Sequence, residues 1–325
     1  MTEKKPKEIV NIIRERTFGD IIGAPFQFII QEFKLFAGTL LKFAGPFVAL
    51  VFLTVSLLAN DIYSSTVSNT NLSETTTIYG ILLLLSLILG MFSVLAVTHS
   101  YITLYVERGK GNFTKDDVGV LLKKTIWKIF GAGILTYVMV IIGVLLLYIP
   151  GIYLAIALTF VFLIIIYEKV SIGKAISRSF ELIKGNWWKT FGLILVFGMI
   201  IGTTSYVFII PIYVVFILAA VSGTQISIGS AVMVTLFVFL YFTAYMFFMS
   251  MQQIMIAFQY FNISVQKEGA HLKDRIAAIS ENEENPEFEK EIIENNDEEK
   301  NEKEKNAEKN RFIKDEDINR FKPKQ

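Results

Sequence analysis

Long apolar segments alternate with short polar segments along the first 260 residues. Each apolar segment approaches or exceeds the roughly 20 residues that a helix needs to cross a bilayer. The strict apolar–polar alternation of transmembrane β-strands is missing from them. The pattern therefore predicts an all-α integral membrane protein whose six spans form a transmembrane bundle. The expected spans cover residues 43–59, 78–106, 129–149, 151–167, 190–221 and 230–259.

Two prolines bear on the limits of these spans. Pro150-Gly151 separates the third span from the fourth, and this pair is a strong turn signal, so we expect a tight hairpin there. Pro211 lies within the fifth apolar segment. The sequence leaves open whether the fifth span ends before Pro211 or continues past it.

Lysine and arginine occur in every second segment between the spans. They are present before residue 43, in 107–128, in 168–189 and after residue 266, and absent from the intervening segments 60–77, 150–151 and 211–229. Short cytoplasmic loops of membrane proteins carry the excess of Lys and Arg. This alternation predicts that both termini lie in the cytoplasm.

Three of the basic segments have apolar residues at helical spacing, at about 18–33, 117–128 and 172–184. Each ends in an aromatic-Lys-x-Phe step into a span, and Thr17 with Asp20 and Thr114 with Asp117 have capping-box spacing. We predict three repeats of an interfacial amphipathic helix followed by a helical hairpin, with a kink or interruption at Pro25. The alternative to a repeat is that any helix that enters a membrane is amphipathic at the end that lies in water.

Composition and charge divide the chain into unlike parts. Residues 1–260 carry a net charge of +6 and residues 261–325 a net charge of −5. The second part is rich in Glu, Lys and Asn, so we expect a mostly disordered cytoplasmic tail that offers a site for a protein partner. We accordingly divide the chain into an N-terminus (1–17), a membrane domain (18–260) and a tail (261–325). Cysteine is absent, which excludes disulfides and thiol chemistry.

Candidate binding chemistry gathers where the basic segments meet the spans. Arg178 is expected either to clamp a lipid phosphate or to form an ion pair with Glu168, and the ion pair is preferred. His99 is interpreted as a packed or interfacial residue. No cofactor, metal or nucleic-acid partner is expected, membrane lipids are the expected partners, and the sequence does not indicate an oligomeric state. The candidate headgroup or ion-pair residues are Trp127, Lys128, Glu168, Arg178, Lys184, Trp187, Trp188 and Lys189.

The stretch YIPGIYL at 148–154, then Glu168, then AISRSFELIKGNWW at 175–188 resembles the membrane domain of bacterial glycerophosphoryl diester phosphodiesterases and related uncharacterised multi-pass proteins. The resemblance covers most of 16–260 and implies an integral domain of the bacterial inner membrane. The family's catalytic part is a barrel, which takes about 250 residues. Because 65 residues follow Tyr260, we expect no enzymatic activity.

The expected function is the organisation of lipids or partner proteins at the cytoplasmic membrane. The alternative is a transporter or channel for a small or lipid-like substrate. Coupled transporters generally place ionisable residues near the bilayer midplane. No Asp, Glu, Lys or Arg occurs between Thr190 and Gln259, which counts against the alternative.

Overall fold

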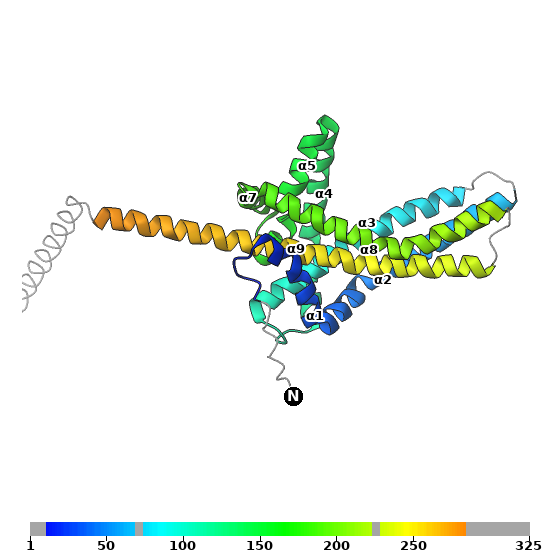
Figure 1. The fold of residues 1–325 in the computed structure, drawn as a ribbon, viewed down its shortest axis with the longest axis horizontal. Coiled ribbons are helices and arrows are strands. Elements are labelled where there is room, and N and C mark those ends of the chain that lie inside the picture. Colours follow the sequence, from blue (N-terminus) through cyan, green and yellow to red (C-terminus); the bar gives the residue numbers. More distant parts are fainter. Residues whose placement is uncertain (1–10, 69–73, 223–227, 284–325) are drawn as a thin grey trace, which may run out of the picture. The chain divides into compact units, whose positions relative to one another are not determined.

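The structure is a computed structural model that describes residues 11–68, 74–222 and 228–283 (Figure 1). All the regular elements in these residues are α-helices, and the chain divides into two compact units, Met1–Val265 and Gln266–Gln325. The first ten residues of the predicted N-terminus and the predicted tail beyond residue 283 lie outside the described residues. The helices are α1 (Phe18–Phe43), α2 (Gly45–Val67), α3 (Glu74–Arg108), α4 (Lys115–Leu146), α5 (Tyr148–Ala157), α6 (Val161–Tyr167), α7 (Ile172–Ile183), α8 (Trp187–Ser222) and α9 (Ile228–Glu283).

Six stretches of the described residues are helical, long and apolar enough to cross a membrane, which confirms the predicted spans. The fourth span consists of α5 and α6 together, and α8 continues through Pro211, which settles the question left open for the fifth span. Helix α2 packs along α3, and α4 packs along α5. The spans are Gly45–Ile62, Glu74–Arg108, Lys115–Leu146, Tyr148–Tyr167, Trp187–Val215 and Leu236–Gly269.

The turn between the third and fourth spans lies three residues earlier than predicted. Leu147 is extended (φ −160°, ψ 133°) and ends α4, while Pro150 and Gly151 lie in the first turn of α5. Proline is tolerated there because the first N–H groups of a helix have no intrahelical partner. Gly151 permits a close approach of the two helices, since a Cβ on it would lie 2.7 Å from the backbone nitrogen of Val144.

The predicted threefold repeat is not confirmed. Helix α1 runs to Phe43 without interruption at Pro25, and α4 runs unbroken from Lys115 into its span, so residues 117–128 are not a separate helix. The third segment does form its own helix, α7. It is separated from α8 by a turn at Gly185, whose positive φ of 81° favours glycine.

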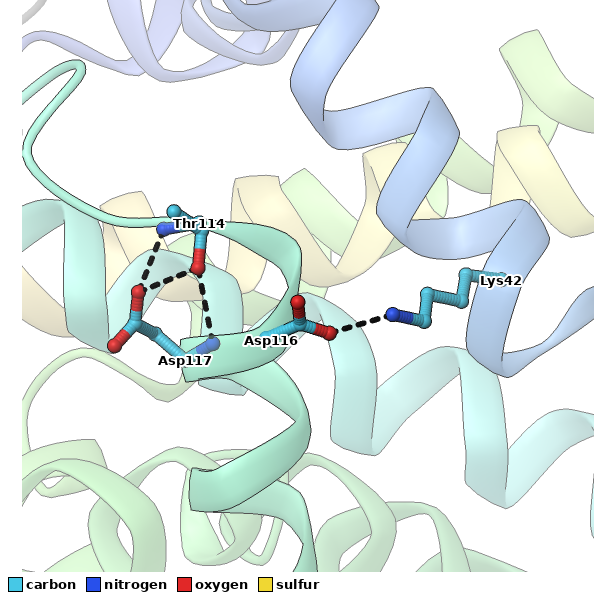
Figure 2. A network of polar contacts seen from close by, with 4 residues as sticks. All are labelled: Lys42, Thr114, Asp116 and Asp117. Carbon is cyan, nitrogen blue, oxygen red and sulfur yellow. Dashed lines mark hydrogen bonds and ion pairs between the residues drawn. The ribbon is translucent and has the colours of Figure 1, made fainter.

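Both predicted capping boxes are present. The Thr17 hydroxyl accepts from the Asp20 backbone N–H, Asp20 accepts in return, and these hydrogen bonds hold the pKa of Asp20 below its usual range. Thr114 and Asp117 make the same reciprocal contacts at the start of α4 (Figure 2). Figure 2 also shows Lys42 pairing with Asp116 at 2.6 Å, which joins the end of α1 to the start of α4.

The buried residues of α1 coincide only in part with the apolar stripe in residues 18–33. Phe28, Glu32 and Phe36 are buried, whereas Ile30 and Phe33 of the predicted stripe are more than half exposed. The helix is apolar on two sides, so spacing alone does not identify the side that meets protein. In a membrane, an exposed apolar side is not penalised, because lipid tails are as apolar as the side chains.

Candidate functional site

Helix α4 carries a basic and aromatic face where it meets the membrane. Lys123, Lys124, Trp127 and Lys128 are all exposed, and their spacing of three to four residues places them on one side of the helix. The apolar residues 129–146 that follow rise about 27 Å, close to the thickness of a bilayer core. Lysine and tryptophan side chains favour the headgroup region, and Trp127 is 81% exposed.

An apolar cavity of about 410 Å³ adjoins this face. Its walls come from the end of α1 and from α2, α3 and α4, and Trp127 forms part of its lining. The hydroxyl of Ser93, which also lines the cavity, donates to the backbone oxygen of Phe43 at 3.0 Å, so its hydrogen-bonding need is met. Other lining side chains are Phe47, Leu89, Phe92, Leu122, Ile126 and Phe130.

The sequence did not reveal this cavity. Its aromatic and aliphatic residues come from four helices. In the sequence, each of these residues is indistinguishable from the other apolar residues of its helix. The lining is mostly apolar, so the cavity can accept hydrocarbon without leaving polar groups unpaired.

Arg178 lies between two carboxylates on the polar side of α7. Its Nη1 is 3.0 Å from Glu181 Oε1, and its Nε is 3.6 Å from Glu168 Oε1. Burial disfavours the charge on Arg178, but the hydrogen bond to Glu181 and the charges of both carboxylates raise its pKa above the usual value. The geometry contains the ion pair with Glu168 that the sequence favoured over a lipid clamp.

Tyr260 completes this cluster and was missed in the sequence. Its hydroxyl donates to Glu168 Oε1 at 2.6 Å from a position 92 residues further along the chain. A similar arrangement surrounds the buried Glu32 on α1, which accepts from the Tyr101 hydroxyl at 2.8 Å and lies 3.1 Å from Lys110 Nζ. Both carboxylates thus combine a tyrosine with a cation, and sequence spacing gives no sign of either pairing.

The two adjacent tryptophans at the start of α8 have different surroundings. Trp187 stacks on Tyr153 and Phe191, and its Nε1 donates to the backbone oxygen of Tyr153 at 3.3 Å, so it ties α8 to α5. Trp188 is 77% exposed. Lys184 and Lys189 are exposed as well. Trp188 and these two lysines remain available to lipid, whereas Trp187 has a structural contact.

His99 is fully buried on α3, in agreement with the packed role expected for it. Neither ring nitrogen has a hydrogen bond of ordinary geometry, and the side-chain amide of Gln253 on α9 interacts with the ring. Within the described residues, no three His, Cys, Asp or Glu side chains are grouped so as to hold a metal ion.

Comparison with protein families matches residues 129–312 to the membrane domain of glycerophosphoryl diester phosphodiesterase. The match covers more than half of the 325 residues. The chain belongs to this family. No curated protein and no solved structure matches it.

This family assignment and the six apolar helical spans establish an integral, multi-pass membrane protein. The match to the glycerophosphoryl diester phosphodiesterase membrane domain contains the motif at 148–188 that carried the resemblance. It begins at the base of the third span and extends to residue 312, so it includes much of the segment assigned to the tail and leaves out α1 to α3. The match concerns a membrane domain, and the expected absence of enzymatic activity stays a prediction.

Proposed function

We propose that this protein is a non-enzymatic membrane protein that organises anionic lipid in the cytoplasmic leaflet through α4. The observation that carries the proposal is the apolar cavity of about 410 Å³ beside the exposed basic face of the same helix. The cavity receives an acyl chain, while Lys123, Lys124 and Lys128 attract the headgroup phosphate. Trp127 lines the cavity and also lies beside the three lysines.

The charge of the lysines and the position of the tryptophan both favour lipid binding at this site. A basic side chain near an anionic surface contributes about 1 kcal/mol. An acyl chain that enters the cavity from the bilayer exchanges one apolar environment for another, so the cavity contributes through packing contacts. Tryptophan prefers headgroup depth because its ring is amphipathic. No ion pair in the described part of the chain involves the three lysines of this face. They therefore reach lipid phosphate without giving up a carboxylate partner.

The proposal is tested by counting retained lipids on the full chain with native mass spectrometry after extraction from mixed phosphatidylglycerol and phosphatidylethanolamine nanodiscs. Replacing Lys123, Lys124 and Lys128 by Gln should reduce the preference for phosphatidylglycerol by about tenfold or more. The matched control replaces the exposed lysines Lys174, Lys184 and Lys189, which have the same charge but lie outside α4. Equal losses in the two triple variants would contradict a specific site on α4.

A change inside the cavity separates chain binding from charge. Leu89→Trp places a larger side chain in the lining and should lower the retention of both phospholipids while keeping the preference between them. Unchanged retention would show that the cavity holds no acyl chain. The lysine face would then act through charge alone.

We also propose that both termini lie in the cytoplasm of a bacterial cell. The alternation of Lys and Arg between the spans supports this orientation. Because the chain has no cysteine, single cysteines report on topology without background. Ser68→Cys should react with an impermeant thiol reagent in intact cells, and Ser280→Cys should react after the membrane is opened. Reaction at Ser280→Cys alone in intact cells would reverse the orientation.

A transporter or channel for a small or lipid-like substrate is the second candidate. The interruption of the fourth span between α5 and α6 supports it, since broken helices commonly line substrate sites in transporters. A solute-flux and lipid-transfer panel in proteoliposomes tests this candidate. Flux that depends on the protein would favour transport over lipid organisation.

A further inference from the structure

A second cavity, of about 290 Å³, lies where the fourth span is interrupted. Helix α5 ends at Ala157 and α6 begins at Val161, and turns at residues 158–160 interrupt the regular α-helical pattern between them. Irregular backbone at membrane depth is tolerated where it is buried in protein or lines a cavity. Here it does line one, because Leu158 and Thr159 form part of the wall.

The cavity is lined by residues of the membrane spans. Thr159 belongs to the span Tyr148–Tyr167, and Gln252 and Gln253 belong to the span Leu236–Gly269. Thr136 lies within the third span, between Lys128 and the end of α4. Polar side chains within membrane spans are costly and mark functional sites when they face a shared interior space.

Its lining is mostly apolar, and the polar side chains in it carry no charge. Two threonines, one tyrosine and two glutamines contribute, and none of the lining residues is Asp, Glu, Lys or Arg. Amide and hydroxyl groups both donate and accept hydrogen bonds. Their natural complement is a ligand with many hydroxyl groups and no net charge, because an ion would lack a counter-charge in the wall.

His99 adds a second observation. Its ring is fully buried, both ring nitrogens lack hydrogen bonds of ordinary geometry, and the ring interacts with the amide of Gln253. Gln253 thus contacts the His99 ring and also lines the cavity, where its amide can form hydrogen bonds with a hydroxylated ligand.

We propose that this cavity binds an uncharged polyhydroxylated group, either a free sugar or the sugar headgroup of a neutral glycolipid. This site shares no lining residue with the cavity beside α4, so the two proposals are tested independently. Ligand pockets in proteins begin at about 300 Å³. The cavity therefore holds one sugar-sized group and not a large ligand.

Two neighbouring residues of α8 provide a matched test of access. Ile194 lines the cavity, whereas Leu195 is 45% exposed on the outside of the bundle at nearly the same depth. In the full chain in nanodiscs, a small charged methanethiosulfonate should modify Ile194→Cys about tenfold faster than Leu195→Cys, because thiolates react where water reaches them. Equal rates would show that no hydrated cavity exists.

Protection experiments identify the ligand. Glucose should slow the modification of Ile194→Cys, and glucose 6-phosphate should not, because the wall has no cation to bind phosphate. The glycolipid arm uses nanodiscs that contain diglucosyl diacylglycerol without free sugar. Protection by this lipid alone identifies a headgroup site, and protection by neither glucose nor the lipid overturns the proposed ligand class.

Substitution of the lining checks that protection arises at this site. In the Ile194→Cys background, Gln252→Leu should abolish protection by removing one amide from the wall. Thr204→Val is the control, since Thr204 is on the same helix as Ile194, does not line the cavity, and bonds to its own helix backbone at Ile200. Protection that persists in Gln252→Leu would contradict binding at this site.

Discussion

The two halves of α3 have opposite surroundings. Residues 74–91 are mostly exposed, with Leu84, Leu85 and Ile88 between 46% and 61% exposed. Residues 94–105 are almost all buried, and the helix is enclosed there on every side. Polarity is reversed with respect to a soluble protein, because the exposed half is rich in leucine while the buried half contains Thr98, Ser100 and Thr103.

This contrast shows that the surrounding medium, here lipid, determines which side chains are buried. In lipid, burying a leucine yields no hydrophobic gain, so packing and hydrogen bonding hold the helices together. The buried half of α3 provides both, through the ring contacts of Tyr101 with Phe36 and Phe113 and its hydroxyl bond to Glu32. The exposed half serves as a lipid-facing wall.

The largest expected effect is the loss of Tyr101. Tyr101→Ala should destabilise the protein by about 3–5 kcal/mol, as large-to-small changes of buried aromatics do, and it also removes the hydroxyl that bonds Glu32. Leu84→Ala, in the exposed half of the same helix, should change stability by less than about 1 kcal/mol. Unfolding monitored by steric trapping in bicelles measures both. Similar losses at the two positions would show that the halves do not differ.

The hairpin of α4 and α5 gives an intermediate effect. A Cβ on Gly151 would lie 2.7 Å from the backbone nitrogen of Val144, so Gly151→Ala should separate the helices at a cost of about 1–3 kcal/mol. At Gly198, on the lipid-facing side of α8, nothing lies within 4 Å of the added carbon. Gly198→Ala should therefore be neutral or slightly stabilising. A thermal unfolding midpoint that falls equally in both variants would contradict close packing at the hairpin.

The smallest effect concerns the cluster around Arg178. Glu168→Ala and Arg178→Ala should show a coupling free energy of about 0.5–1 kcal/mol in a double-mutant cycle, since both side chains are partly exposed. The pKa of Arg178 is raised, so its share of the stability is present at all pH values below its unfolded pKa and is lost as the pH rises through the folded one. The coupling should thus be the same at pH 7 and pH 9. Zero coupling would remove the ion pair and leave the lipid clamp as the role of Arg178.

Local features of the fold were predicted well from the sequence. The spans follow from hydropathy over about 20 residues, and the capping boxes follow from two residues three positions apart. The turn between α4 and α5 was misplaced because Pro150-Gly151 is equally acceptable in the first turn of a helix. The protein-facing side of α1 was not predicted, because both of its sides are apolar.

Long-range features were not predictable in the same way. Tyr260 reaches Glu168 across 92 residues, and the two cavities take their walls from several helices each. Such contacts depend on how helices pack, and periodicity describes one helix at a time. Of the candidate residues, Arg178 and Trp187 lie in structural contacts, whereas Trp127, Lys128 and Trp188 are exposed.

The most direct test of the contrast between the two halves of α3 is the oxygen accessibility of nitroxide labels in nanodiscs. The absence of cysteine allows single labels at Leu84, Ile88, Thr98 and Thr103. Oxygen concentrates in hydrocarbon, so the account expects high accessibility at Leu84 and Ile88 and low accessibility at Thr98 and Thr103. Accessibility that is uniform along the helix, or higher at Thr98 and Thr103, would contradict it.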